Sequence, residues 1–505
     1  MKSQIKQLGR HSLIFGFGDS LKGMIGFMLL PVYTRFLTPA DYGQLELLRT
    51  TISVLLVIAA QGIGSAFFRS YVFIEKELNA SANDLISTSY LYILLSAFAV
   101  SASLYLFSGE YNAFIFGSGT SEILVKITAV SLCFEIIMLV PYQVFRAKME
   151  SVKFITLSLV HFFLQLALNI YFVTVLRMGV KGILMGNAIS SSVMVVATFL
   201  MIKKHLVLKI SGGVLKDLLA FGFPLIFSSL FYWMLQMSDR FLLQKFSSTH
   251  ELGLYSLGTR FASVLPMLIV FPFQKVWGAM SFQVAARDDA RETFRIITTY
   301  FYLLLCFTGA GLIIWSPPVI KIIAGREFWD THKVIFPLVC ANVGSGMLLI
   351  SGFGIYMLKK TKYISLFVGL SAAANIALNL TLIPVYGMMG AAYVSFASNL
   401  LLNFLCYRLS QKVYFIPFDM PRLLKISLIF LAVSVSSTLL HPSNVMADVL
   451  YRLFLTALFF GGLIISGFFE YTEIRSMKNA YGRLLEQPGF SNKFKYAYEL
   501  IIGQT

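Results

Sequence analysis

The chain alternates long apolar runs with short polar segments along almost all of its 505 residues. A helix that crosses the hydrocarbon core of a bilayer needs about 20 predominantly apolar residues. Runs of that length predict an all-α polytopic membrane protein with about 14 transmembrane helices. The predicted spans are 12–34, 46–68, 85–107, 121–144, 153–176, 180–202, 215–238, 252–277, 294–316, 333–358, 361–384, 387–409, 422–440 and 449–469.

Composition supports a bilayer environment. Hydrophobic residues make up 57% of the chain and charged residues only 13%, whereas soluble domains carry about 25% charged residues. A net charge of +17 could indicate a nucleic-acid partner. The basic residues lie in short runs between apolar segments instead, so membrane lipids are the expected partner and nucleic acid is not. The four cysteines lie inside apolar segments without paired spacing, so neither a metal site nor a disulfide framework is expected. No cofactor is expected either.

The distribution of basic residues predicts the orientation. Most of the 41 Lys and Arg residues fall on one alternate set of loops, and such a bias marks the cytoplasmic side. We therefore expect an inner-membrane protein with both termini in the cytoplasm. The first apolar run carries Asp19 and Lys22 and lacks a small-residue cleavage site, so it is predicted to be a retained helix.

Two stretches about 210 residues apart share three motifs in the same order. Glycine in the motif that recurs at 179–182 and 387–390 permits close helix approach or a positive φ. Six spans separate the copies, and an even number restores orientation, so we predict parallel lobes with a cleft between them. The expected divisions are a six-helix lobe at 1–210, a second at 211–420, two extra helices at 421–470 and a basic tail at 471–505. The paired motifs are Arg35-Phe36-Leu37 with Arg240-Phe241-Leu242, Asp41-Tyr42-Gly43 with Glu251-Leu252-Gly253, and Gly179-Val180-Lys181-Gly182 with Gly387-Met388-Met389-Gly390.

The segment from Met28 to Gly43, MLLPVYTRFLTPADYG, resembles the first-helix signature of bacterial polysaccharide flippases. These proteins belong to the multidrug/oligosaccharidyl-lipid/polysaccharide exporter superfamily. The segments 238–243 and 252–256 look like the counterpart in the second lobe. The resemblance implies alternating access and an undecaprenyl-diphosphate-linked oligosaccharide as substrate, moved to the periplasmic leaflet. It also implies a polymerase and glycosyltransferases of the same pathway as partners.

Ionised side chains inside a bilayer are costly and usually mark a pathway or a partner. Asp19 and Lys22 lie one turn apart in the first span and can pair. In one interpretation Lys22 attracts the substrate diphosphate, while Asp19 holds it and responds to protonation. In the other, the two residues form a permanent ion pair that closes the lobes. Arg49 and Arg260 follow the repeated motifs at equivalent places. Guanidinium groups bind phosphate with a bidentate fork, so the pair suits a diphosphate. Snorkelling to the interface is the alternative.

Four further residues are candidates for coupling or gating. Asp239 and Arg240 lie at the end of a span, where a structural ion pair is the alternative. Glu135 lies mid-span without a neighbouring charge. It could couple proton movement to transport, and a hydrogen-bonded structural acid is the alternative. His161 could titrate near neutrality, although packing is the usual role of a lone histidine.

The sequence contains no phosphate loop, zinc spacing or nucleophile elbow, so neither an enzyme nor an ATP-driven pump is expected. A cation-coupled drug exporter of the same superfamily is the nearest rival, but it should line its cavity with carboxylates. A membrane-embedded glycosyltransferase or O-antigen ligase would need a larger outer loop than this chain has. A structural scaffold would leave the charges within the membrane unexplained.

Overall fold

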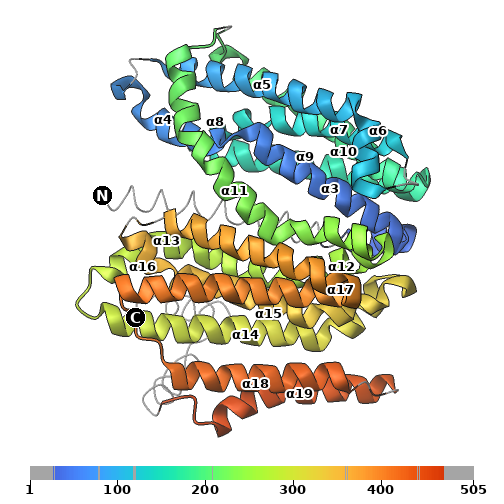
Figure 1. Ribbon diagram of the computed structural model, residues 1–505, viewed down its shortest axis with the longest axis vertical. Helices are drawn as coiled ribbons and strands as arrows, with labels where there is room; N and C mark the ends of the chain where they lie inside the picture. The colour runs from blue at the N-terminus through green and yellow to red at the C-terminus, as the bar shows by residue number, and fades with distance from the viewer. Residues whose placement is uncertain are drawn as a thin grey trace, which may run out of the picture. The chain divides into compact units, whose positions relative to one another are not determined.

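The computed structural model describes residue 27 and residues 29–77, 80–117, 121–207, 209–358, 360, 362–440, 442 and 444–470. Within these ranges the chain is helical and contains no strand. Figure 1 shows the arrangement of its helices. The α-helices are α2 (Leu30–Phe36), α3 (Pro39–Ala60), α4 (Ile63–Glu77), α5 (Ala82–Leu106), α6 (Ser108–Phe116), α7 (Glu122–Ile137), α8 (Leu139–Ala147), α9 (Ser151–Ile170), α10 (Gly179–Ile202), α11 (Gly212–Phe246), α12 (Thr249–Ala262), α13 (Phe271–Ala285), α14 (Ala290–Ile323), α15 (His332–Ser351), α16 (Phe353–Met357), α17 (Lys362–Val413), α18 (Met420–Leu439) and α19 (Val445–Ile465).

The all-helical membrane fold predicted from the sequence is confirmed. Twelve helices of the described chain are long and apolar enough to cross a membrane. One of them, α17, is broken by a non-helical φ of 53° at Gly387 and contains both predicted spans 361–384 and 387–409. The predicted span 12–34 lies mostly outside the described residues. The count of fourteen spans therefore stays a prediction.

The second repeated motif begins a helix in each half of the chain. Thr38 caps α3 by accepting a hydrogen bond from the Asp41 amide at 3.2 Å. Ser248 caps α12 by accepting one from the Glu251 amide at 3.1 Å. Such caps satisfy an amide that has no partner within its helix. Glu251 also accepts a hydrogen bond from the Met388 amide at 2.8 Å, which ties the start of α12 to the break in α17.

The third repeated motif shows the backbone conformation expected of it. Gly179 and Gly387 both adopt a positive φ, of 55° and 53°. A side chain in this region would strain the backbone, whereas glycine adopts it freely. The motif therefore marks the same tight turn between helices in the two halves of the chain.

Helices α3 and α12, one from each half, cross at the glycines of the second motif. A Cβ on Gly43 would lie 2.2 Å from the carbonyl oxygen of Thr249. A Cβ on Gly253 would overlap the carbonyl oxygen of Pro39. Only residues without a side chain allow two helix backbones to approach this closely. The two copies of the motif thus pack directly against each other.

Helix α11 makes a second contact between the two halves. Its first turns pack on α4, where Asp217 pairs with Arg69 at 3.1 Å and accepts a hydrogen bond from Ser70 at 2.8 Å. Later in the same helix, Ser238 reaches α17. Figure 1 shows α11 running obliquely from the helices of the first half to those of the second. This helix therefore belongs to the packing of both halves.

The chain forms two compact units. Of the described residues, one unit contains those up to Thr298 together with Trp315–Pro417. The other contains Thr299–Ile314 and the described residues from Phe418 to Glu470, which include α18 and α19. The lobe boundaries 1–210 and 211–420 predicted from the sequence stay a prediction.

A buried arginine holds the second unit together. Arg452 of α19 pairs with Asp448 at 2.8 Å and donates a hydrogen bond to the carbonyl oxygen of Ile314 in α14. Pro318 has no amide hydrogen to donate to that carbonyl, which lies four residues earlier in α14. The guanidinium therefore replaces the hydrogen bond that the proline removes.

Replacement of Gly253 by alanine should destabilise the protein. The added methyl group would overlap the Pro39 carbonyl and force α3 and α12 apart. Overpacking of this kind typically costs about 1–3 kcal/mol, so the melting temperature of the purified protein should fall by several degrees. Gly311→Ala is the control, because a Cβ at Gly311 meets nothing within 4 Å. Equal melting temperatures for the two variants would contradict the close crossing.

Candidate functional site

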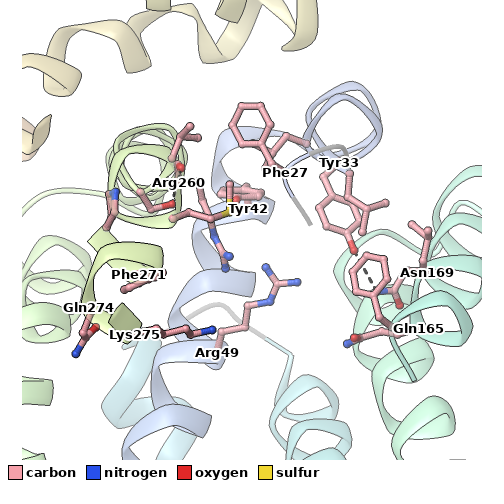
Figure 2. A pocket seen from close by; sticks show the side chains of 18 residues that line it. Phe27, Tyr33, Tyr42, Arg49, Gln165, Asn169, Arg260, Phe271, Gln274 and Lys275 are labelled. Atoms are coloured by element: carbon pink, nitrogen blue, oxygen red, sulfur yellow. Dashed lines mark hydrogen bonds between the residues drawn. The ribbon is translucent and has the colours of Figure 1, made fainter. Parts of the chain in front are cut away.

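A cavity of about 610 Å³ lies between α2 and α9 of the first half and α12 and α13 of the second. Its wall mixes charged, amide and aromatic side chains (Figure 2). A site with a few convergent polar groups on an apolar background is typical of small-molecule recognition. Its lining residues are Phe27, Leu29, Leu30, Tyr33, Tyr42, Arg49, Phe162, Gln165, Leu166, Asn169, Arg260, Ser263, Val264, Pro266, Met267, Phe271, Gln274 and Lys275.

Three cations line this cavity. Arg49 comes from α3, Arg260 from α12 and Lys275 from α13. Figure 2 shows the guanidinium groups of Arg49 and Arg260 facing the same space, with Lys275 reaching toward it. The cavity's described lining residues include no Asp or Glu. The wall is therefore suited to an anion.

The two arginines are not strict equivalents in the repeat. The register set by Gly43 and Gly253 pairs Arg49 with Thr259 and pairs Arg260 with Thr50. Each arginine is thus displaced by one position from the other. One residue turns a helix by about 100°, but the close crossing of α3 and α12 still brings both guanidinium groups to one carboxylate.

That carboxylate belongs to Glu46 of α3. Its Oε1 accepts a hydrogen bond from Arg49 Nη1 at 2.7 Å and another from Arg260 Nη2 at 3.1 Å. The Glu46 side chain is only 9% exposed, whereas that of Arg260 is 48% exposed. Glu46 and Arg260 therefore form an ion pair between the two halves of the chain, at the edge of the cavity.

Amide side chains form the opposite wall. Asn169 of α9 donates hydrogen bonds to Tyr33 of α2 and to Asn187 of α10, each at 3.1 Å. Gln165 donates to the same Asn187 oxygen at 2.6 Å. Figure 2 shows Tyr33, Asn169 and Gln165 together on the side of the cavity away from Lys275. This network holds α2 against α9 and presents amide groups to the cavity.

Asp239 and Arg240 form a buried ion pair at 2.7 Å in α11. Asp239 also accepts hydrogen bonds from Tyr255 and, at 3.4 Å, from Ser395. A second cavity, of about 310 Å³, is lined by this pair and shares Arg260 with the first. The pair is therefore a neighbour of the cationic wall.

Two of the other candidates, Glu135 and His161, lie away from this cavity. Glu135 of α7 is partly buried and accepts a hydrogen bond from Ser131 at 3.2 Å. His161 of α9 lies 3.4 Å from the Ser191 hydroxyl. Neither residue lines the central cavity. Asp19 and Lys22 lie outside the described residues.

Sequence reasoning missed Glu46 and Lys275. Glu46 is the first residue of the predicted span 46–68, and Lys275 lies near the end of the predicted span 252–277. In the structure, Glu46 lies well inside α3, and Lys275 lies inside a helical stretch that can span a membrane. The three-residue spacing of Glu46 and Arg49 was the available signal, because it places the two side chains on one helix face.

Comparison with known proteins shows the family to which the chain belongs. Residues 32–333 match the model of the family described as polysaccharide biosynthesis protein. The chain belongs to the polysaccharide biosynthesis protein family. Protein 1 of the Lsg locus of Haemophilus influenzae is 25% identical to this family member over 406 residues, which are 76% of this chain and 94% of the relative.

Solved transporters share its fold. The lipid II flippase MurJ, in an inward closed conformation, superposes with a TM-score of 0.71 at 16% identity, covering 88% of this chain and 98% of MurJ. An inward-facing multidrug resistance MATE family transporter gives a TM-score of 0.60 at 13% identity, covering 82% and 95%. The resemblance to a polysaccharide-transport family, noted from the sequence, is confirmed by the family match. This polysaccharide biosynthesis protein shares its fold with transporters of the exporter superfamily.

Removal of the Asp239 carboxylate should destabilise this polysaccharide biosynthesis protein. Asp239→Ala would leave Arg240 as an uncompensated buried charge, which typically costs about 3–5 kcal/mol. The melting temperature should fall markedly, and the double variant Asp239→Ala/Arg240→Ala should recover part of the loss. Asp289→Ala is the control, because Asp289 pairs with Arg287 on an exposed surface and should leave the melting temperature unchanged. A double variant less stable than Asp239→Ala would contradict this account.

Proposed function

We propose that this protein moves an undecaprenyl-diphosphate-linked oligosaccharide from the cytoplasmic to the periplasmic leaflet of the bacterial inner membrane by alternating access. The observation that carries the proposal is the cationic wall of the central cavity. Arg49, Arg260 and Lys275 line it, and the described lining residues include no carboxylate. An acidic lipid headgroup could leave water only where charges of opposite sign replace its hydration.

The two walls of the cavity suit the two parts of such a headgroup. A guanidinium fork matches the oxygens of a phosphate, and hydrogen bonds between charged partners are about twice as strong as neutral ones. Amides such as Gln165 and Gln274 can hydrogen-bond sugar hydroxyls, and Phe162 and Phe271 provide apolar faces. The diphosphate would thus bind the cations, and the first sugar would face the amides.

The family and the fold agree with this proposal. Members of the matched family are described as polysaccharide biosynthesis proteins, and one protein of similar fold is a lipid II flippase. The rival activity, export of cationic drugs, needs carboxylates that face the cargo. Among the described residues, the carboxylate that pairs with Arg49 and Arg260 is Glu46, and Asp239 of the adjoining cavity pairs with Arg240.

The remaining candidates extend the proposal. Asp239 and Arg240 would gate the transport pathway, because the cavity that they line shares Arg260 with the cationic wall. Glu135 and His161 would couple transport to ion movement, and Asp19 and Lys22 would contribute to headgroup binding. With both termini cytoplasmic, the protein would receive its substrate from glycosyltransferases inside and deliver it to a polymerase outside.

The double variant Arg49→Gln/Arg260→Gln tests the proposal. Each hydrogen bond to a charged group contributes about 1.5–3 kcal/mol, and 1.4 kcal/mol is tenfold in affinity. We therefore expect roughly a hundredfold weaker binding of the lipid-linked oligosaccharide to the protein in nanodiscs. Cells that carry only this variant should lose surface polysaccharide and accumulate the lipid-linked precursor on the cytoplasmic leaflet.

Arg287→Gln is the matched control, because it removes the same charge from an exposed arginine outside the cavity. It should leave binding and export unchanged, and protein levels should be equal in all strains. Normal export by the double variant would contradict the proposal. Efflux of a cationic dye that depends on this protein would favour the drug-export alternative.

A further inference from the structure

Glu46 is a carboxylate at the edge of the cationic wall, and it lines the adjoining cavity of about 310 Å³ that shares Arg260. Its Oε1 bridges Arg49 Nη1 at 2.7 Å and Arg260 Nη2 at 3.1 Å. A phosphate oxygen would seek the same guanidinium protons. Glu46 therefore occupies the donors that an incoming phosphate needs.

The bridge also joins the two halves of the chain. Glu46 lies one turn after Gly43 in α3, and Arg260 lies two turns after Gly253 in α12. The ion pair thus stands directly beside the glycine crossing, on the cavity side. Any group that takes Arg260 away from Glu46 removes a link between α3 and α12.

The two arginines are not equally open to a ligand. The Arg49 side chain is 27% exposed and that of Arg260 is 48% exposed. A phosphate can therefore reach Arg260 first.

We propose that Glu46 is a resident competitor for the substrate's diphosphate, and that exchange of Arg260 from Glu46 to the diphosphate unlocks α3 from α12. This inference rests on the proposed function. In the empty protein, the Glu46 carboxylate holds Arg260 and keeps the crossing closed. The diphosphate takes over Arg260, so only a ligand with enough negative charge to displace a carboxylate opens the site.

The same exchange would favour release. A ligand that departs leaves two guanidinium groups close together, and their repulsion would slow its departure. Glu46 supplies the replacement anion within the same site. The carboxylate thus limits affinity for the substrate and allows turnover, and a neutral side chain at this position should trap the ligand.

Glu46→Gln tests this role, because glutamine keeps the size and a hydrogen-bonding oxygen but removes the charge. The full chain in nanodiscs is titrated with farnesyl diphosphate as a probe of the diphosphate headgroup. We expect the variant to bind roughly tenfold more tightly than wild type or better, which corresponds to about 1.4 kcal/mol. Glu292→Gln is the control, since Glu292 pairs with Arg295 at 2.6 Å with the same spacing outside the cavity. It should bind as wild type does.

A second readout follows the link between α3 and α12. Phe107 and Val385 are both exposed and are the labelling positions. Spin labels attached there, in a variant that lacks the native cysteines, would report the separation of the two halves by double electron–electron resonance. Glu46→Gln should widen the distance distribution without ligand, as saturating farnesyl diphosphate does for wild type.

The outcomes separate this inference from the proposed function. If wild type binds the probe and Arg260→Gln abolishes binding, while Glu46→Gln binds no more tightly than wild type, the competitor role is overturned and the proposed function stands. If neither wild type nor Glu46→Gln binds the probe, both proposals are overturned. Tighter binding by Glu46→Gln together with ligand-free widening supports both.

Discussion

The close crossing of α3 and α12 brings together the charged residues Glu46, Arg49 and Arg260 of the candidate site. Gly43 and Gly253 let the two backbones touch where no side chain would fit. One turn beyond, the same approach puts Glu46 within reach of an arginine from the other half of the chain. Without this crossing, Arg49 and Arg260 would belong to separate bundles and could not share a carboxylate or a cavity.

Desolvation explains why the charged residues of this protein are organised into small sets. A charge taken out of water must find a partner nearby. Arg240 has Asp239, and Arg452 has Asp448 and a carbonyl that a proline leaves without its usual donor. The cationic wall differs from these structural pairs, because among the described residues its two arginines, Arg49 and Arg260, share the one carboxylate of Glu46.

The two copies of the repeat share their turns and helix caps but differ in their charged residues. Matching glycines and helix caps recur in both halves of the chain. The charges do not recur: Glu46 aligns with Ser256, and each arginine aligns with a threonine. The two halves thus share the geometry of their turns and crossings, while the anion-binding chemistry is divided between them.

The sequence by itself determined the helical membrane fold, the approximate spans and the paired glycine motifs. Apolar run length and glycine chemistry are local properties that need no knowledge of the packing. The partners of the charged residues depended on the tertiary structure. Glu46 and Arg260 are 214 residues apart in the chain. The sequence places Lys275 near the end of the predicted span 252–277 but does not show that it lines the same cavity as the two arginines. Which charges meet is decided by how two helices cross, and a difference of one residue in register rotates a side chain by about 100°.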